Sequence, residues 1–128
     1  MFTDIVGFTD LMSNDESKAL NILQKKIQTV QSEVDNCNGS YVKDIGDGTL
    51  SFFESATKAV DCAVKIQDLL KDNISIRIGL HLGEVIHKDG DVFGDDVNIA
   101  SRVEGFAPAG GICVSDKVYN DIFSSPEI

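Results

Sequence analysis

The feature that most constrains the fold is a strict alternation of aliphatic residues over residues 74–83. Every second residue is aliphatic and the residues between them are polar, charged or glycine: Ile74, Ile76, Ile78, Leu80 and Leu82 alternate with Ser75, Arg77, Gly79, His81 and Gly83. A period of two places the aliphatic side chains on one face of a β-strand. Burial of each contributes roughly 1.5–3 kcal/mol, so the chain must build a sheet with one covered face. We interpret His81, on the other face, as structural.

The remaining patterns predict helices and strands that alternate along the chain. Leu20, Leu23, Ile27, Val30 and Val34 have the spacing of one helix face. We expect that helix to begin near Ser13 or Asn14 and to end at Asn38-Gly39. The other predicted elements are strands at Ser40–Ile45, Thr49–Phe53 and Ile112–Val114, and helices at Ser55–Asp72, Gly94–Ala107 and Lys117–Phe123.

This order predicts an α+β fold of one domain. The arrangement expected is a ferredoxin-like βαββαβ sheet with helices on one face plus a C-terminal extension. The other face of the sheet would then be free and would need a cover or a partner. We expect the domain to span residues 1–128 and to be truncated at both ends, as a piece of a longer protein.

Composition narrows the classes of function. The chain has 128 residues, 42% of them hydrophobic, and a formal net charge of −10, which argues against a nucleic-acid groove and against contact with an anionic membrane surface. No apolar run is long enough to cross a membrane. Cys37, Cys62 and Cys113 are widely spaced, which predicts reduced thiols in a cytoplasmic protein rather than a zinc site or disulfides.

Two carboxylates stand at positions that suggest a metal site. Asp4 lies inside a short apolar run, Phe2–Val6, where a buried charge needs either a basic side chain or a metal ion to offset it. Asp47 lies in the Gly-Asp-Gly turn of a predicted hairpin. Asp47 can equally be a residue that only favours the turn, and Lys43 can be a solvated lysine of the strand. Together the two aspartates would suit Mg²⁺ or Mn²⁺, and two ions about 3.5–4 Å apart are typical of phosphoryl or nucleotidyl transfer.

Three motifs in order, FTDIVGFT, KDIGDG and DVFGDDVNIASR, resemble the catalytic domain of the class III nucleotidyl cyclases, in particular the bacterial adenylate cyclase branch. The resemblance extends from Phe2 to about Phe123, and three motifs together are far more specific than one. It implies the nucleotidyl cyclase fold. It also implies that the enzyme converts ATP to 3′,5′-cyclic AMP and pyrophosphate, in a homodimer whose two sites each draw residues from both chains.

The resemblance further implies a role for each matching residue. Asp4, Asp47 and the carbonyl group of Ile5 would bind two Mg²⁺ or Mn²⁺ ions per site. The backbone at Gly7, Phe8 and Thr9 would hold phosphate oxygens. Lys43 and Asp91 would recognise adenine, Asn98 would position the ribose, and Arg102 would stabilise charge on the α-phosphate. Regulatory domains in the full-length chain are expected.

Three alternatives remain open from the sequence. The domain could be a catalytically inactive cyclase-like module for regulation, dimerisation or nucleotide sensing, although Asp4, Asp47, Asn98 and Arg102 are all present. A diguanylate cyclase is disfavoured because its Gly-Gly-acidic-Glu-Phe signature is absent from the sequence. A purely structural ferredoxin-like domain would leave the charge of Asp4 unexplained.

Overall fold

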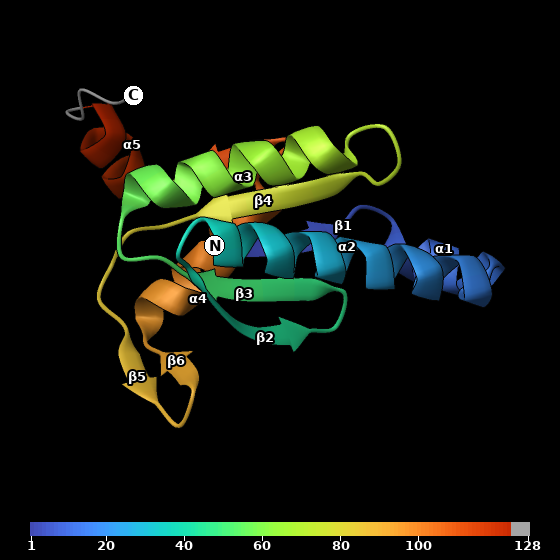
Figure 1. Cartoon of the computed structure of the whole chain (residues 1–128), viewed down its shortest axis with the longest axis horizontal. Coiled ribbons are helices and arrows are strands. Elements are labelled where there is room, and N and C mark those ends of the chain that lie inside the picture. The colour runs from blue at the N-terminus through green and yellow to red at the C-terminus, as the bar shows by residue number, and fades with distance from the viewer. Residues whose placement is uncertain (124–128) are drawn as a thin grey trace.

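The computed structural model of the chain describes residues 1–123, and their elements are shown in Figure 1. The strands are β1 (Phe2–Ile5), β2 (Ser40–Ile45), β3 (Gly48–Phe52), β4 (Ile76–Leu80), β5 (Ile86–Lys88), β6 (Asp91–Phe93) and β7 (Ile112–Val114). The helices are α1 (Phe8–Asn14), α2 (Glu16–Asn36), α3 (Ala56–Leu70), α4 (Asp95–Gly105) and α5 (Asp116–Phe123).

A five-stranded sheet of order β2-β3-β1-β4-β7 forms the centre of the molecule. The first four strands pair antiparallel, and β7 joins the edge parallel to β4. The elements β1-α2-β2-β3-α3-β4 reproduce the predicted βαββαβ unit, and α4, β7 and α5 form the C-terminal extension. The predicted α+β fold class is therefore confirmed. It places β1, which carries Asp4, in the interior of the sheet.

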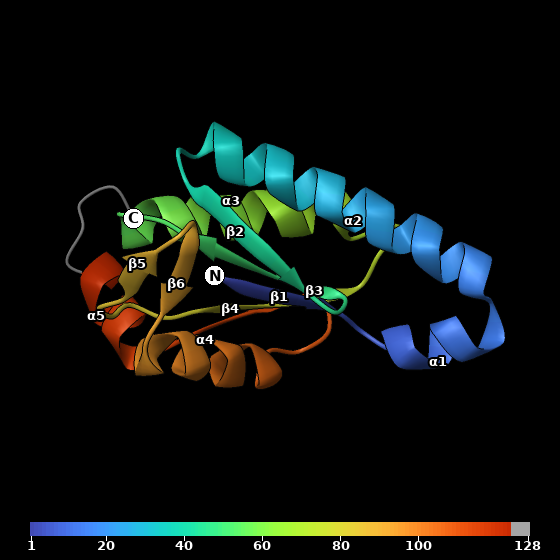
Figure 2. The ribbon, with the colours of Figure 1, turned by 90° about the horizontal axis from the view of Figure 1, so that it is seen from below.

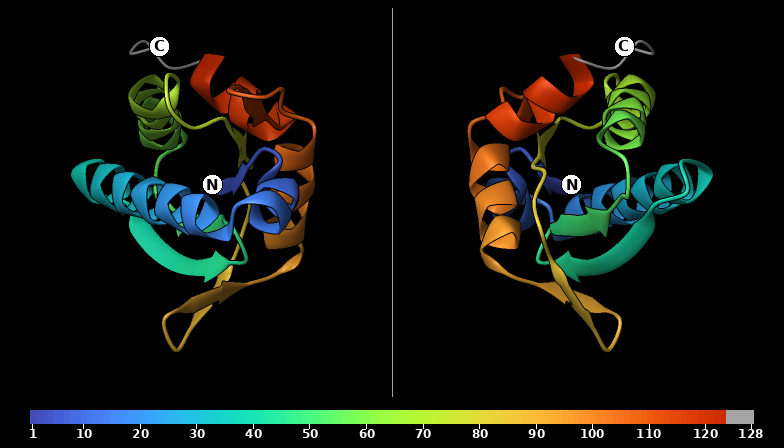
Figure 3. Two further views of the ribbon diagram at one scale, coloured as in Figure 1. Left: turned by 90° about the vertical axis from the view of Figure 1, so that its right-hand side faces the viewer. Right: turned by 90° about the vertical axis from the view of Figure 1, so that its left-hand side faces the viewer.

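Helices α2 and α3 lie together on one face of the sheet, as Figures 2 and 3 show. The core beneath them contains the alternating aliphatic residues of β4, with Ile76 and Ile78 fully buried and Leu80 2% exposed. These side chains pack in one cluster with residues of α2 and α3 that share a buried face: Val30, Val34, Ala59, Cys62, Ala63, Ile66 and Leu70. The alternation in the sequence thus identified the covered face correctly.

The opposite face is not free throughout, because α4 lies against it (Figure 2). The contact is possible because Gly79 has no side chain: a Cβ atom there would lie 2.3 Å from the backbone nitrogen of Glu104. The expectation of one uncovered face is corrected for this part of the sheet. A glycine between buried isoleucine and leucine residues was the sequence signal for this close approach.

The first helical stretch is divided into two helices at Asp15. Its side chain caps α2 by accepting a hydrogen bond of 3.1 Å from the backbone N–H of Lys18, so the start lies just beyond the predicted Ser13 or Asn14. The buried face of α2 also differs from the prediction. Lys26 is fully buried, whereas Leu20 is 48% exposed.

Two differences concern the strands. β4 ends at Leu80, its last residue paired with β7, so the predicted strand is too long and Leu82 is exposed. The predicted turn around Asp89-Gly90 is the tip of a hairpin of two short strands, β5 and β6, which projects from the sheet (Figure 3). Residues 124–128 of the predicted domain lie outside the described part of the chain. Within the described part, no helix has the length and apolar character that a membrane span requires.

Candidate functional site

Asp47 lies in the turn of the β2–β3 hairpin, and it comes beside β1 because β3 pairs antiparallel with β1. Thr3 of β1 pairs with Thr49 of β3, so the hairpin turn comes level with Ile5. Gly46 adopts φ 60°, a left-handed conformation that lets the turn close tightly. The Asp47 Oδ2 atom accepts a hydrogen bond of 2.8 Å from the backbone N–H of Ile5, the residue after Asp4. The structure therefore brings the predicted metal-binding residues Asp4, Ile5 and Asp47 together.

The side chain of Asp4 lies on the face of the sheet that α4 covers. Its Oδ1 atom is buried, has no hydrogen-bond partner within residues 1–123, and lies 4.0 Å from a guanidinium nitrogen of Arg77 on β4. The guanidinium group of Arg77 donates its Nε–H to the carbonyl oxygen of Ala107 instead. An incompletely paired buried carboxylate oxygen costs free energy that a cation can offset.

Glu104 of α4 adds a further carboxyl group beside Asp4. Burial raises the pKa of Glu104 to about 8, and two effects of Asp4 act in the same direction: its carboxylate accepts a hydrogen bond from the protonated Glu104 carboxyl, and its charge repels the ionised form. Arg77 opposes this shift. Glu104 is 7% exposed, so its proton is shielded from water as well. The negative charge of Asp4 is thus one reason that Glu104 keeps its proton near neutral pH.

Lys26 approaches the same group of carboxylates from α2. Its Nζ atom donates a hydrogen bond of 2.6 Å to the backbone carbonyl oxygen of Asp47. Burial lowers the pKa of Lys26 to about 8, whereas the carboxylates around it, first Asp47 and then Asp4, raise it. Asp47 is therefore held through its backbone by α2 and through its side chain by β1.

These residues fit a hard divalent cation. The oxygen atoms of Asp4, Asp47 and the Ile5 carbonyl are the kind of ligand that Mg²⁺ and Mn²⁺ prefer, and the Oδ1 atom of Asp4 has no hydrogen bond within residues 1–123 that such an ion would have to replace. Within residues 1–123, no cluster of three or more His, Cys, Asp and Glu side chains is arranged to hold a metal ion. Two side chains and one carbonyl leave coordination positions for substrate phosphates, which is typical of Mg²⁺ sites.

The two residues predicted to recognise a purine form an ion pair. Lys43 of β2 and Asp91 of β6 are 48 positions apart in the sequence, yet Lys43 Nζ lies 2.9 Å from Asp91 Oδ2. The hydrogen bond from Lys43 lowers the pKa of the Asp91 carboxyl, and a hydrogen bond from the Val92 N–H contributes. The Lys43 ammonium also lies 5.9 Å from the centre of the Phe93 ring.

Asn98 and Arg102 lie one turn apart on α4, and both are exposed. None of the hydrogen bonds and ion pairs within the described chain joins either residue to Asp4 or Asp47. The start of α4 is fixed instead by Asp96, which accepts hydrogen bonds of 2.8 Å from His81 Nε2 and 3.1 Å from the N–H of Glu84. The side chain of His81 is 6% exposed, and its Nδ1 atom lies 2.8 Å from Ser115 Oγ. Both observations agree with the predicted structural role.

The segment Gly7–Thr9 forms the start of α1. Gly7 is the N-cap residue, with φ 69°, and within residues 1–123 no side chain hydrogen-bonds to the cap. The first backbone N–H groups of α1, near Phe8 and Thr9, thus have no side-chain acceptor. The structure places them a few residues after Asp4, at the end of β1.

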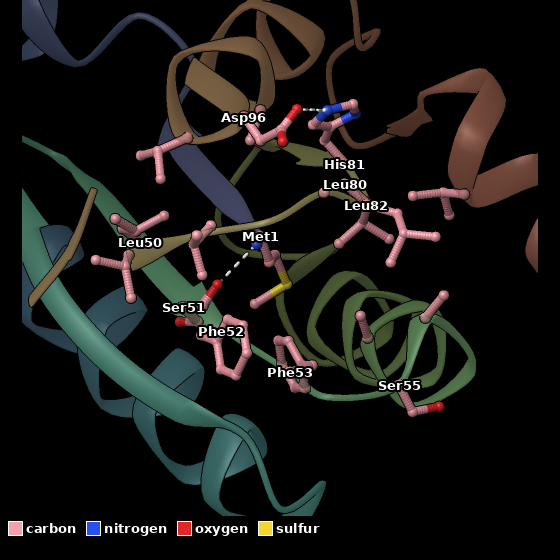
Figure 4. Close-up of a pocket in the computed structure, with 18 residues that line it drawn as sticks. Met1, Leu50, Ser51, Phe52, Phe53, Ser55, Leu80, His81, Leu82 and Asp96 are labelled. Carbon is pink, nitrogen blue, oxygen red and sulfur yellow. Dashed lines mark hydrogen bonds and ion pairs between the residues drawn. The ribbon is translucent and has the colours of Figure 1, made fainter. Parts of the chain in front are cut away.

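An apolar cavity of about 80 Å³ lies elsewhere, at the other end of β1 (Figure 4). Leu50, Leu80 and the hydrogen-bonded pair His81–Asp96 contribute to its lining. None of the residues predicted to bind metal, phosphate or purine lines it. The cavity is therefore separate from the candidate site.

Sequence reasoning missed Lys26, Arg77 and Glu104 as members of this site. The signal for Lys26 was present: it lies seven residues after Ala19 and four before Val30, both of which are fully buried. From the sequence alone, a lysine at such a position is interpreted as solvated, because the residues that pack around it in the fold are not known. Glu104 gives no comparable signal, because its burial depends on the absent side chain of Gly79.

Comparison with known proteins identifies the same family along the whole described chain. The family model of the adenylate and guanylate cyclase catalytic domain matches residues 1–123. The chain is 35% identical to a putative adenylate cyclase 3 of Rhizobium meliloti over 98% of its length, and 32% identical to an adenylate cyclase of Streptomyces coelicolor over 88%. It spans 23% and 31% of these two relatives.

A solved structure agrees with the fold. The chain superposes with a TM-score of 0.88 and 32% identity on the catalytic core of a rhodopsin–guanylyl cyclase with converted specificity, in complex with ATPαS. The match covers 96% of this chain and 78% of that one.

Proposed function

The chain belongs to the adenylate and guanylate cyclase catalytic domain family, and from this premise we propose that it converts ATP to 3′,5′-cyclic AMP and pyrophosphate. The observation that carries the choice of ATP is the ion pair between Lys43 and Asp91. These two residues match the family positions that recognise the purine, and the fold brings them into contact across the sequence.

The chemistry of this pair suits adenine. A carboxylate such as that of Asp91 accepts a hydrogen bond from the exocyclic amine of adenine, while the ammonium of Lys43 donates to a ring nitrogen. Guanine presents a carbonyl oxygen and a ring N–H at the corresponding atoms. Both would be mismatched, and unpaired buried polar groups disfavour such binding.

The other residues would act on the ribose and the phosphates. Asn98 would hold the ribose so that its 3′-oxygen lies in line with the α-phosphorus, and Arg102 would stabilise the charge that develops there. Asp4, Asp47 and the Ile5 carbonyl would hold the metal ions. When bound, Mg²⁺ or Mn²⁺ makes the 3′-oxygen more acidic and neutralises the triphosphate. The backbone N–H groups at Gly7–Thr9 would donate to phosphate oxygens.

A site of this kind requires two chains. Asn98 and Arg102 are exposed on α4, and within residues 1–123 no hydrogen bond or ion pair joins them to either aspartate. A homodimer would set Asp4 and Asp47 of one protomer opposite Lys43, Asp91, Asn98 and Arg102 of the other. Because the chain spans less than a third of the two bacterial relatives, further regulatory segments in the full-length protein are part of the proposal.

Exchange of the purine-recognition pair tests the proposed specificity. The double variant Lys43→Glu/Asp91→Cys should shift the preference from ATP toward GTP, since a carboxylate at position 43 can accept from the guanine N–H groups. The readout is the ratio of cyclic AMP to cyclic GMP formed with Mn²⁺. Lys65→Glu, which changes an exposed lysine of α3, is the charge control and should keep the wild-type ratio. Undiminished selectivity for ATP in the double variant would show that these two residues do not recognise the purine.

The alternative of an inactive nucleotide-binding module makes a different prediction. Such a module would bind ATP and Mn²⁺ and yet release no pyrophosphate at any protein concentration. Measurement of pyrophosphate alongside nucleotide binding distinguishes the two functions.

A further inference from the structure

Helix α2 contains a buried lysine in contact with the candidate site. Lys26 is 0% exposed, although its sequence neighbour Lys25 is exposed on the same helix. A buried ammonium group costs free energy, and an aliphatic side chain would fill the same position without that cost. The fold therefore retains a charge where packing alone does not require one.

The single acceptor found for this ammonium is a backbone atom of a predicted metal-binding residue. Within the described chain, Lys26 Nζ donates to the carbonyl oxygen of Asp47 at 2.6 Å. It does not bind the Asp47 side chain, whose Oδ2 atom accepts instead from the Ile5 N–H at 2.8 Å. The two hydrogen bonds attach the hairpin turn to α2 on one side and to β1 on the other.

The charges around Lys26 show why it is tolerated there. Four carboxyl groups from three other parts of the fold interact electrostatically with it and raise its pKa: Asp47 and Asp44 of the β2–β3 hairpin, Asp4 of β1 and Glu104 of α4. A positive charge among them offsets their mutual repulsion, which would otherwise displace a glycine-flanked turn. Because Lys26 engages the backbone, the Asp47 carboxylate stays available to a cation.

We propose that Lys26 is a positioning residue of the catalytic site, which holds the Asp47 turn against β1 so that the Asp4 and Asp47 carboxylates can bind the same metal ions. The inference rests on the proposed function for the role of Asp47 in metal binding. Its structural part, that Lys26 fixes Asp47 beside Ile5, stands independently of catalysis.

Three variants of the chain test this inference: Lys26→Met, which keeps the length of the side chain without charge or donor, Lys26→Arg, which restores both, and Lys25→Met as the matched control. The first readout is hydrogen exchange of the Ile5 amide followed by NMR in metal-free protein. In Lys26→Met this amide should exchange about tenfold faster or more, because its acceptor on Asp47 is no longer held. Lys26→Arg and Lys25→Met should retain wild-type protection.

The second readout is binding of Mn²⁺ alone, measured by electron paramagnetic resonance of the free ion. Loss of a group that orients a metal ligand weakens metal binding by roughly 10–100-fold, and we expect this for Lys26→Met, with kcat reduced and KM for ATP little changed. Lys26→Arg should recover most of the Mn²⁺ affinity. Unchanged Ile5 exchange and unchanged Mn²⁺ affinity in a folded Lys26→Met protein would overturn the inference.

The outcomes separate this inference from the proposed function. If the wild-type chain forms no cyclic AMP, the proposed function fails, but the exchange of the Ile5 amide still decides the role of Lys26. If Lys26→Met does not fold, as judged by circular dichroism, Lys26→Leu, which also lacks a donor, takes its place. A folded Leu variant with unprotected Ile5 then supports the inference, and one with full protection and Mn²⁺ affinity overturns it.

Discussion

At the scale of single residues, the notable feature is the number of ionisable groups buried around Asp4 and Asp47. Lys26 and Glu104 are almost completely shielded from water, and the pKa of each moves to about 8 from opposite directions. A structural domain would replace such groups with apolar ones, because burial of charge rarely stabilises a fold. Their retention beside Asp4 and Asp47 indicates that this polar surrounding has a use, and support of a cation-binding site supplies one.

Glu104 should make the stability of the metal-free protein depend on pH. Its pKa is raised from 4.5 to about 8, so the folded state keeps a proton that the unfolded state releases between these values. Stability should therefore fall as pH rises through this window, by roughly 1–3 kcal/mol for this one group. Glu104→Gln should lessen that fall. The measurement is urea unfolding at pH 5 and pH 8 in the presence of a chelator.

Glu54→Gln is the control for this prediction, because Glu54 is exposed. It should retain the wild-type pH dependence. An equal loss of stability between pH 5 and pH 8 in wild type and Glu104→Gln would contradict the assigned ionisation of Glu104.

How much of the site was predictable differs from residue to residue. Asp4 and Asp47 could be paired from residue type and context alone, because a charge in an apolar strand and an Asp-Gly turn are local signals. Lys43 and Asp91 could not, since 48 residues separate them and only the family resemblance linked them. Lys26 and Glu104 depend on tertiary packing, which the sequence does not state.

At the scale of elements, the position of α4 depends on one small residue. Gly79 on β4 lets the backbone of α4 come so close that a Cβ atom would lie 2.3 Å from the nitrogen of Glu104. Helix α4 carries Asn98 and Arg102 at its exposed face and Glu104 at its buried face. The packing of one helix against the sheet therefore places three residues of the candidate site.

Gly79→Ala should destabilise the protein by about 2 kcal/mol or more, because either strand or helix must move to admit the methyl group. Gly105→Ala is the matched control: it lies at the end of the same helix, and a Cβ atom there meets no atom within 4 Å. The control should unfold at the wild-type urea concentration or slightly above it. Equal midpoints for Gly79→Ala and wild type would show that the contact is not tight.

The elements themselves were predictable where the periodicity was long. The β4 alternation and the helix now seen as α2 were both found, because each repeats over several turns or residue pairs. The β5–β6 hairpin was not, since two strands of three residues carry no usable period. The packing of α4 on the second face of the sheet was not predicted. Gly79 indicates that another element can approach β4 closely, but it does not identify that element.

At the scale of the whole molecule, the proposed site is divided between two protomers, and this division can be tested by complementation. Asp4→Ala and Arg102→Ala should each abolish cyclic AMP formation in isolation, as should Asp47→Ala. An equal mixture of Asp4→Ala and Arg102→Ala should recover about a quarter of wild-type activity, since half of randomly paired dimers carry one intact site of two. The measurement is activity after mixing and equilibration.

A mixture of Asp4→Ala with Asp47→Ala provides the control for complementation. Both substitutions lie in the same half of each site, so no heterodimer has an intact site and activity should stay absent. Absence of recovery in the Asp4→Ala and Arg102→Ala mixture would rule out a site shared between two chains.

The most direct test of the central claim is the formation of cyclic AMP from ATP with Mn²⁺, measured over a range of protein concentrations with GTP in parallel. We predict product from ATP and far less from GTP, with a specific activity that rises with protein concentration as dimers form. Binding of ATP and Mn²⁺ without any cyclic product, at every concentration, would contradict the assignment as a cyclase and favour a nucleotide-binding regulatory module.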